Sequence, residues 1–179
     1  MRKSSNTLTK KPICPQRLDL AQLLVDVTNE YSDAFMRKRI ELEIDLPHNL
    51  WVDLDAIVMR DAFRKVIDNA IEAMPSGGAF VITSLVTKTG LVVEFADSGP
   101  GVSEELKQRL FEPYATTKHD HAGLGLAIVR DIVAAHSGSV DVMPRGWRRV
   151  HDSIAAGSRT ANGSLVRLSK RQSFGRFSN

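Results

Sequence analysis

Two kinds of hydrophobic pattern alternate along the chain and predict helices and strands. Apolar residues recur at helical spacing after Asp19 and predict an amphipathic helix that ends near Arg39. The stretch IELEIDL at 40–46 alternates strictly between apolar and acidic residues, as a half-buried strand does, and LWVD is a second short strand. A second helical stripe follows Asp55, which is placed to cap that helix.

The second half of the chain continues with a hairpin, helices and two more strands. AFVITSLV and LVVEFA, joined by TKTG, predict an antiparallel hairpin. SEELKQRLF at 103–111 is a short helix, and a longer helix runs from about Leu124 to His136, where Gly138 ends it. SVDVM and GSLVRLS supply the last two strands. Strands that neighbour each other in sequence predict an α+β fold, a mixed sheet with helices on one face.

Composition bounds the class of protein. The chain has 179 residues, 42% of them hydrophobic and 25% charged, which predicts one soluble globular domain. Its single cysteine, Cys14, allows no internal disulfide and suits a reducing compartment. No apolar run approaches the roughly 20 residues of a membrane helix, and residues 1–17 have no signal-peptide core. We therefore expect a cytoplasmic protein, with a disordered leader at 1–16, one domain at 17–170 that contains a long loop insertion at 144–162, and a tail at 171–179.

The charge is unevenly placed, although the formal net charge is only +3. The segment from Arg145 to Asn179 is rich in lysine and arginine and contains one acidic residue, Asp152. A basic segment can contact nucleic acid or acidic lipid. No aromatic platform or nucleic-acid motif accompanies it, so we interpret it as a solvated region with no specific nucleic-acid partner.

Two glycine-rich sequences carry the candidate chemistry. DSGPG at 97–101 follows the hairpin, and GLGLA at 123–127 runs directly into the helix predicted from Leu124. Glycines at the start of a helix let backbone N–H groups approach phosphate oxygens, and the helix dipole favours the anion. Either glycine pair alone is weak evidence for a phosphate site, because such pairs are common in ordinary turns.

The order of the motifs is more specific than any one of them. RKVIDNAIEAM at 64–74, then DSGPG, FEPY, TTK and GLGLAIV, resembles the N, G1, F and G2 boxes of the GHKL ATPase superfamily. The strongest resemblance is to the catalytic ATP-binding domain of bacterial sensor histidine kinases, and it covers residues 17–143 and GSLVRLS. It implies a Bergerat-type two-layer sandwich with an ATP lid, a bound ATP with Mg²⁺, and two-component signal transduction.

The resemblance assigns the metal and the adenine to residues of the N and G1 boxes. Asn69 offers a neutral amide oxygen on a helix edge, which is a suitable hard ligand for Mg²⁺. Asp97 offers an acceptor-only carboxylate for the adenine amino group. Gly99 and Gly101 let the chain pass close under the base.

The resemblance assigns the remaining nucleotide contacts to the lid, the phosphate loop and the last strand. Phe111 matches the aromatic residue of the F box, and Lys118 is a candidate for contact with the terminal phosphates. The other expected nucleotide contacts are Thr117 in the lid, Gly123, Leu124, Gly125 and Leu126 in the phosphate loop, and the Ser164 hydroxyl in the last strand.

Several positions depart from the family pattern. Lys65 stands where the N box commonly has its first asparagine, and His121 and Ala122 replace the usual glycine and hydroxyl residue before the phosphate loop. The short sequence His119-Asp120-His121 could suggest a metal site, but such a loop cluster is more often exposed to solvent.

The expected reaction is transfer of the ATP γ-phosphoryl group to a histidine on another domain or chain. No histidine lies on a helix upstream of the domain, so we expect the partner to be the phosphoacceptor (dimerisation) domain of a histidine kinase and, indirectly, a response regulator. The alternatives are a stand-alone serine kinase of the anti-sigma type, a non-catalytic nucleotide-binding module, and an ATPase of the gyrase or chaperone kind. FEPY favours the histidine kinase over the serine kinase, and Lys65 disfavours the ATPase because a cation cannot act as the base that orients water.

Overall fold

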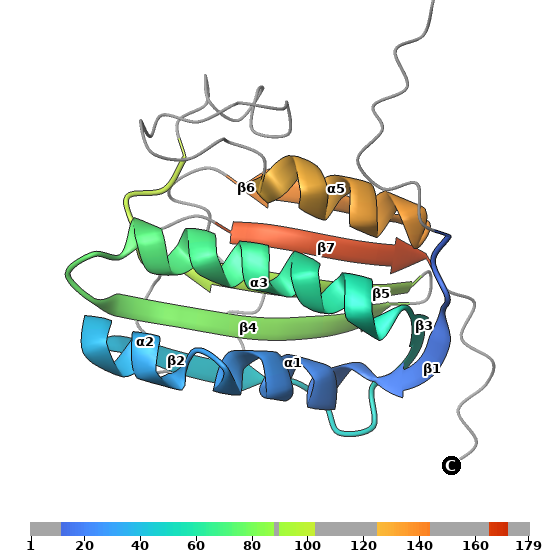
Figure 1. Cartoon of the computed structure of the whole chain (residues 1–179), viewed down its shortest axis with the longest axis horizontal. Helices are drawn as coiled ribbons and strands as arrows, with labels where there is room; N and C mark the ends of the chain where they lie inside the picture. The colour runs from blue at the N-terminus through green and yellow to red at the C-terminus, as the bar shows by residue number, and fades with distance from the viewer. Residues whose placement is uncertain (1–11, 88–89, 103–124, 144–164, 172–179) are drawn as a thin grey trace, which may run out of the picture.

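The fold is an α+β sandwich with one main sheet (Figure 1). The computed structural model describes residues 12–87, 90–102, 125–143 and 165–171. The elements are β1 (Gln16–Asp19), α1 (Leu20–Asn29), α2 (Ser32–Lys38), β2 (Ile40–Asp45), β3 (Trp51–Leu54), α3 (Ala56–Ala73), β4 (Gly78–Thr87), β5 (Gly90–Asp97), α5 (Gly125–Ala135), β6 (Gly138–Met143) and β7 (Leu165–Arg171).

The main sheet has five strands in the order β2-β4-β5-β7-β6. β2 pairs with β4 in parallel, and the other three pairs are antiparallel. The predicted hairpin is present, with Thr87 opposite Gly90 and Phe80 opposite Asp97. β1 and β3 form a separate two-stranded antiparallel sheet. The prediction of a mixed sheet is therefore confirmed.

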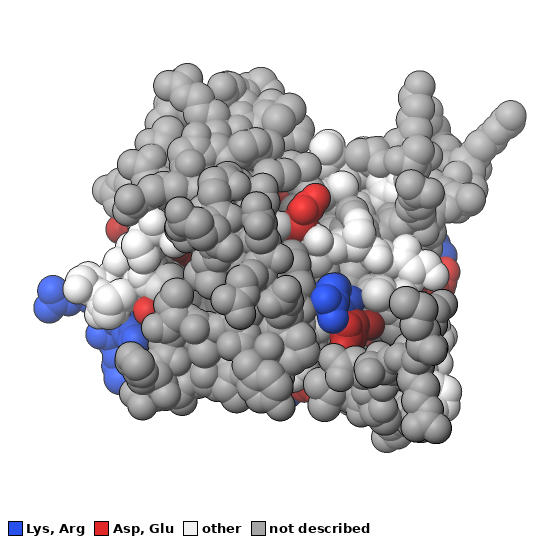
Figure 2. Space-filling model, turned by 90° about the horizontal axis from the view of Figure 1, so that it is seen from above, with Lys and Arg blue, Asp and Glu red and all other residues white. Residues whose placement is uncertain are grey.

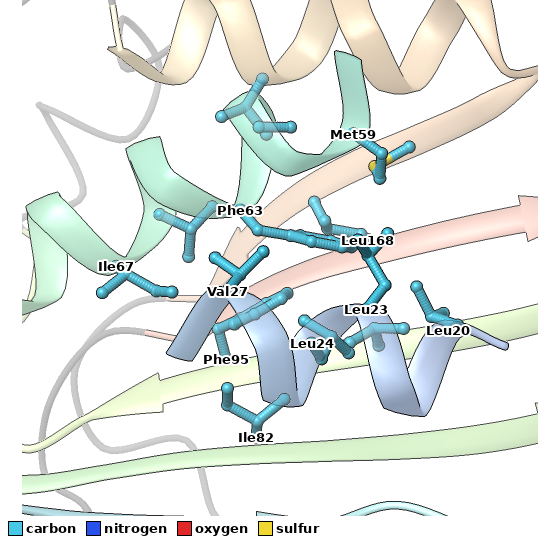
Figure 3. Close-up of a cluster of buried hydrophobic side chains, with 14 of the residues drawn as sticks. Leu20, Leu23, Leu24, Val27, Met59, Phe63, Ile67, Ile82, Phe95 and Leu168 are labelled. Atoms are coloured by element: carbon cyan, nitrogen blue, oxygen red, sulfur yellow. The ribbon is translucent and has the colours of Figure 1, made fainter. Parts of the chain in front are cut away.

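The core lies between the main sheet and the helices that cover one of its faces (Figures 1 and 3). Phe63 of α3 lies with its ring centre 5.7 Å from that of Phe95 in β5, and Phe95 stacks on Phe80 of β4 at 6.4 Å. Figure 3 shows α1, α3 and the sheet contributing side chains to one cluster. Burying each aromatic or aliphatic side chain contributes about 1.5–3 kcal/mol, so this cluster holds the two layers together.

Helix α3 is the longest helix among the described residues, and local sequence explains both of its ends. Asp55 is the predicted N-cap, and its Oδ1 accepts hydrogen bonds from the N–H groups of Ile57 and Val58 at 3.1 and 3.2 Å. At the other end Met74 leaves the helical conformation with φ −120°, and Pro75 follows. The predicted buried stripe is confirmed at Met59, Ala62, Phe63, Val66, Ile67, Ala70, Ile71 and Met74.

The first predicted helix is two helices, which corrects the expectation of one helix from Asp19 to Arg39. The N–H groups of Glu30 and Tyr31 donate to carbonyls three residues back, at 3.2 and 3.0 Å, which tightens the turn and ends α1. The N–H of Phe35 then donates to the Tyr31 carbonyl and opens α2. The apolar stripe continues across the break, and for this reason the pattern alone predicts a single helix.

Two further expectations differ from the structure. β1 was not predicted, because only Leu18 among its four residues is apolar. The residue that turns the chain after α5 is Ser137, with φ 60°, and not Gly138, which is the first residue of β6. A left-handed conformation ends many helices, and here a serine adopts it.

The remaining segmental predictions concern the ends of the chain and its long loops. The helix predicted at 103–111, the insertion at 144–162 and most of the tail lie outside the described residues. The boundary between the leader and the domain, expected between residues 16 and 17, remains a prediction. Cys14 lies in the expected leader, and its backbone N–H donates to the side chain of Asp55 at 2.9 Å. None of the described helices is both long and apolar enough to cross a membrane.

Candidate functional site

Three segments that are far apart in sequence meet at the C-terminal half of α3. The loop after β5 reaches α3 through Gly99, and the start of α5 reaches it through Gly125. Asn69 and Ala73 are the residues of α3 that these two glycines face. In Figure 1 this is the end of the sandwich where α3 ends and α5 begins. The G1 sequence, part of the G2 sequence and the N box are thus brought together.

Asp97 is held in place at the end of β5. It is only 6% exposed, and its Oδ1 accepts the N–H of Gly99 at 2.9 Å. The next residue, Ser98, exchanges two bonds with Ala79: its N–H donates to the Ala79 carbonyl at 3.0 Å, and its Oγ accepts the Ala79 N–H at 2.9 Å. These bonds fix the direction of a buried acceptor group, as recognition of an amino group requires.

Glycine stands at positions 99 and 101 of the DSGPG loop for two different structural reasons. A Cβ atom at Gly99 would lie 2.8 Å from both Cβ and the carbonyl oxygen of Ala73, closer than such atoms pack. Gly101 adopts φ 74°, which a residue with a side chain rarely does. The loop can therefore run directly over the end of α3 only with glycine at position 99, and Gly101 suits the positive φ of the residue that follows Pro100.

Asn69 faces the first turn of α5. A Cβ atom at Gly125 would lie 3.6 Å from its Nδ2, 3.8 Å from its Oδ1 and 4.0 Å from Cδ of Lys65. Asn69 is half-buried, and Lys65, one helical turn earlier, is exposed. Gly125 and Leu126 are the first residues of α5, where backbone N–H groups lack partners within the helix. An amide oxygen, a cation and helix N–H groups thus lie together.

The acid next to Asn69 in sequence points elsewhere. Asp68 accepts a hydrogen bond from the hydroxyl of Tyr31 at 2.9 Å, on the side of α3 that faces the turn between α1 and α2. Burial, together with this hydrogen bond to a carboxylate, raises the pKa of Tyr31 well above its usual range, so the phenol remains a donor. Asp68 therefore fastens α3 to the first helices and is not part of the candidate site.

An ion-pair group lies on the same side of α3. Glu30 binds Arg60 at 2.8 Å and Arg64 at 2.9 Å, and Arg64 also pairs with Asp61 at 3.4 Å. The hydrogen bond from Arg64 holds the pKa of Glu30 below its ordinary value.

In the face seen in Figure 2, the described basic and acidic side chains form small separate groups, with no continuous basic area among them.

At the end of the sandwich opposite the candidate site, a buried hydrogen bond joins His136, after α5, to Asp55, at the start of α3. His136 is 4% exposed, and its Nε2 accepts the N–H of Asp55 at 3.0 Å. Because that N–H can only donate, Nδ1 carries the ring proton and donates to the Ile132 carbonyl at 2.8 Å. Hydrogen bonds from Cys14 and from the first turn of α3 lower the pKa of Asp55. His136 thus links the end of α5 to the start of α3, and no sequence pattern indicates its partner 81 residues away.

The chemistry of the described residues fits a nucleotide with Mg²⁺. A fixed carboxylate suits the adenine amino group, and Asn69 offers an oxygen to a metal that keeps phosphate and water ligands. Glycine at 99 and 125 leaves room beside α3. The remaining expected contacts lie outside the described residues: Phe111, Thr117, Lys118, Gly123, Leu124 and Ser164, together with the His119 to His121 cluster.

Known proteins share this sequence pattern. The pattern that defines the histidine kinase-, DNA gyrase B-, and HSP90-like ATPases matches residues 54–172. The adaptive-response sensory kinase SasA of Rippkaea orientalis is 35% identical over 129 residues, 69% of this chain and 33% of that protein. SasA of a Nostoc species is 32% identical over 157 residues, 83% of this chain and 39% of that protein. The chain therefore spans between a third and two fifths of the length of these two relatives.

Solved structures share the fold. The nucleotide-free catalytic domain of histidine kinase ThkA has a TM-score of 0.74 at 25% identity, over 89% of this chain and 96% of that one. Full-length ShkA in complex with AMPPNP has a TM-score of 0.71 at 25% identity, over 90% of this chain and 32% of that one. The chain therefore belongs to the histidine kinase-, DNA gyrase B- and HSP90-like ATPase family, as an ATP-binding domain of the histidine kinase kind.

Proposed function

We propose that the chain binds ATP with Mg²⁺ and donates the γ-phosphoryl group to a histidine on another domain or chain, in the cytoplasm. The observation that carries this proposal is the meeting of the Asp97–Gly99 loop, Asn69 and Gly125 around one end of α3. Phosphoryl transfer depends mainly on positioning and on stabilising charge, and the site offers groups for both.

Each described group has a proposed role. Asp97 accepts the adenine amino group, while Gly99 and Gly101 form the floor under the base. Asn69 would hold Mg²⁺, and the bound metal would supply positive charge that stabilises the phosphates. Gly125 and Leu126 present the N-terminal N–H groups of α5 to phosphate oxygens.

The proposed partner is the phosphoacceptor domain of a sensor histidine kinase, and through it a response regulator. ThkA has been solved in complex with the response regulator protein TrrA, and that structure has a TM-score of 0.71 to this chain at 25% identity. The SasA relatives are sensory kinases. These likenesses support a role in a two-component pathway for this chain.

A phosphotransfer assay tests the proposal. The chain is mixed with γ-labelled ATP and with phosphoacceptor domains of sensor kinases, supplied as separate proteins. We expect label on the histidine of a cognate acceptor and none on the chain itself, and we expect Asn69→Ala to remove the transfer. Rapid ATP hydrolysis by the chain alone, abolished by Asn69→Ala, would instead place it with the ATPases of the family.

A further inference from the structure

We propose that Lys65 is a phosphate-binding residue of this site, and that it supplies positive charge beside Asn69 in addition to the charge of Mg²⁺. The inference rests on the proposed function, because it takes the ligand of the site to be ATP. It concerns a position where this chain departs from the family pattern, so the resemblance assigns no role to the lysine.

The geometry brings the lysine to the same glycine as the proposed metal ligand. Lys65 and Asn69 are four residues apart in α3 and share one helix face. A Cβ atom at Gly125 would be within contact of both side chains, 3.6 Å from Asn69 Nδ2 and 4.0 Å from Lys65 Cδ. The lysine stem therefore runs beside the start of α5, and its flexible end can reach a ligand that Asn69 also touches.

The acids nearest to Lys65 along α3 are engaged with other groups. Asp61, one turn before it, pairs with Arg64 at 3.4 Å. Asp68, one turn after it, accepts the Tyr31 hydroxyl at 2.9 Å. Glu72 has a partner of its own, two turns from Lys65. Within the described residues, no hydrogen bond or ion pair involves the Lys65 ammonium.

An exposed cation in this position has a clear electrostatic use. The triphosphate of ATP carries several negative charges, whereas Asn69 contributes a neutral amide and the helix N-terminus contributes only partial charges. A lysine ammonium is a compact point charge and a common phosphate ligand. We therefore expect Lys65 to favour ATP over nucleotides with fewer phosphates, and to preserve part of the ATP affinity when Mg²⁺ is removed.

Calorimetric titration of the full chain tests this assignment. Wild type, Lys65→Met and Lys65→Arg are each titrated with ATP, ADP and AMP, once with Mg²⁺ and once with a chelator. The methionine keeps the apolar stem without the charge, and the arginine restores the charge. Arg17→Met is the matched control, because it removes one exposed cation from β1 at the opposite end of the sandwich (Figure 1).

We expect Lys65→Met to bind ATP about tenfold more weakly with Mg²⁺, with a larger loss in the chelator. AMP affinity is unchanged, Lys65→Arg recovers most of the ATP affinity, and Arg17→Met matches wild type. Equal ATP affinity and Mg²⁺ dependence in wild type and Lys65→Met would overturn the inference and leave the proposed function standing. An equal loss for ATP and AMP would also overturn it, because that result indicates a structural role. Wild type that binds none of the three nucleotides would overturn the proposed function itself.

Discussion

Asn69 and Gly125 face each other across the gap between α3 and α5, with room between them for a methyl group. A Cβ atom at Gly125 would lie 3.6 Å from Asn69 Nδ2 and 3.8 Å from Oδ1, which is ordinary contact distance. Gly125 also lies in a regular helix and does not have a positive φ. Packing against the described residues therefore does not require glycine at this position, and we attribute it to the ligand.

Gly125→Ala should separate folding from binding. Gly125 is the first residue of α5, where the preference of a helix interior for alanine over glycine applies only weakly, so we expect the free energy of unfolding of the nucleotide-free protein to change by less than about 0.5 kcal/mol. ATP affinity should fall, because the methyl group fills the space beside Asn69 where phosphate would lie. Thermal unfolding and calorimetry measure the two effects. An unchanged ATP affinity would mean that the ligand does not approach Gly125.

Gly99→Ala should behave in the opposite way. The added Cβ would lie 2.8 Å from both Cβ and the carbonyl oxygen of Ala73, so the loop or the end of α3 must move. Overpacking of this kind costs about 1–3 kcal/mol, and we expect the denaturation midpoint to fall even without nucleotide. Gly125→Ala is the matched control, because it makes the same chemical change where space is available. A midpoint equal to that of wild type would contradict the close approach.

Helices and strands with a strongly periodic apolar pattern could be predicted from the sequence, whereas contacts between residues far apart in sequence could not. The stripe of α3 and the hairpin of β4 and β5 repeat over enough residues to define the element. The break at Tyr31 leaves the apolar spacing intact, and β1 is too short to show alternation. For the site, the motifs named Asn69, Asp97 and Gly125, but only the fold shows that Asp68 turns toward Tyr31 while Lys65 lies beside Gly125.

His136→Ala should destabilise the end of the molecule opposite the nucleotide site. The substitution leaves the N–H of Asp55 without its acceptor, and it enlarges an apolar cavity of about 40 Å³ that the His136 ring helps to line. A lost buried hydrogen bond costs about 1–3 kcal/mol, and the cavity adds to this. Chemical denaturation measures the loss, with His48→Ala on the exposed loop as the control. Equal stability of the two variants would argue against the link between α5 and α3.

Asp55 should make folding stability depend on pH in acid. Its pKa in the folded state lies below the ordinary value of 3.8, so its contribution is complete above that value and is lost as the pH falls through the lower folded-state value. Asp55→Asn keeps an oxygen at the N-cap but cannot ionise. We expect this variant to lose less stability than wild type between about pH 4 and pH 2. Asp55→Ala should instead be weaker by about 1 kcal/mol at neutral pH, since the cap itself is removed. Parallel acid profiles for wild type and Asp55→Asn would contradict this role.

The most direct test of the proposed nucleotide site is whether the chain prefers ATP to inosine triphosphate, and whether Asp97 causes the preference. The two nucleotides carry the same phosphates, but inosine has a carbonyl oxygen where adenine has its amino group. The buried Asp97 carboxylate accepts hydrogen bonds and cannot donate them, so it suits the amino group of adenine and not the carbonyl oxygen of inosine. We therefore predict that calorimetry will show ATP binding about tenfold or more tightly than inosine triphosphate. Asp97→Asn, whose amide can also donate, should reduce that difference. No ATP binding at millimolar nucleotide, or equal affinity for the two nucleotides, would contradict the assignment of this site to ATP.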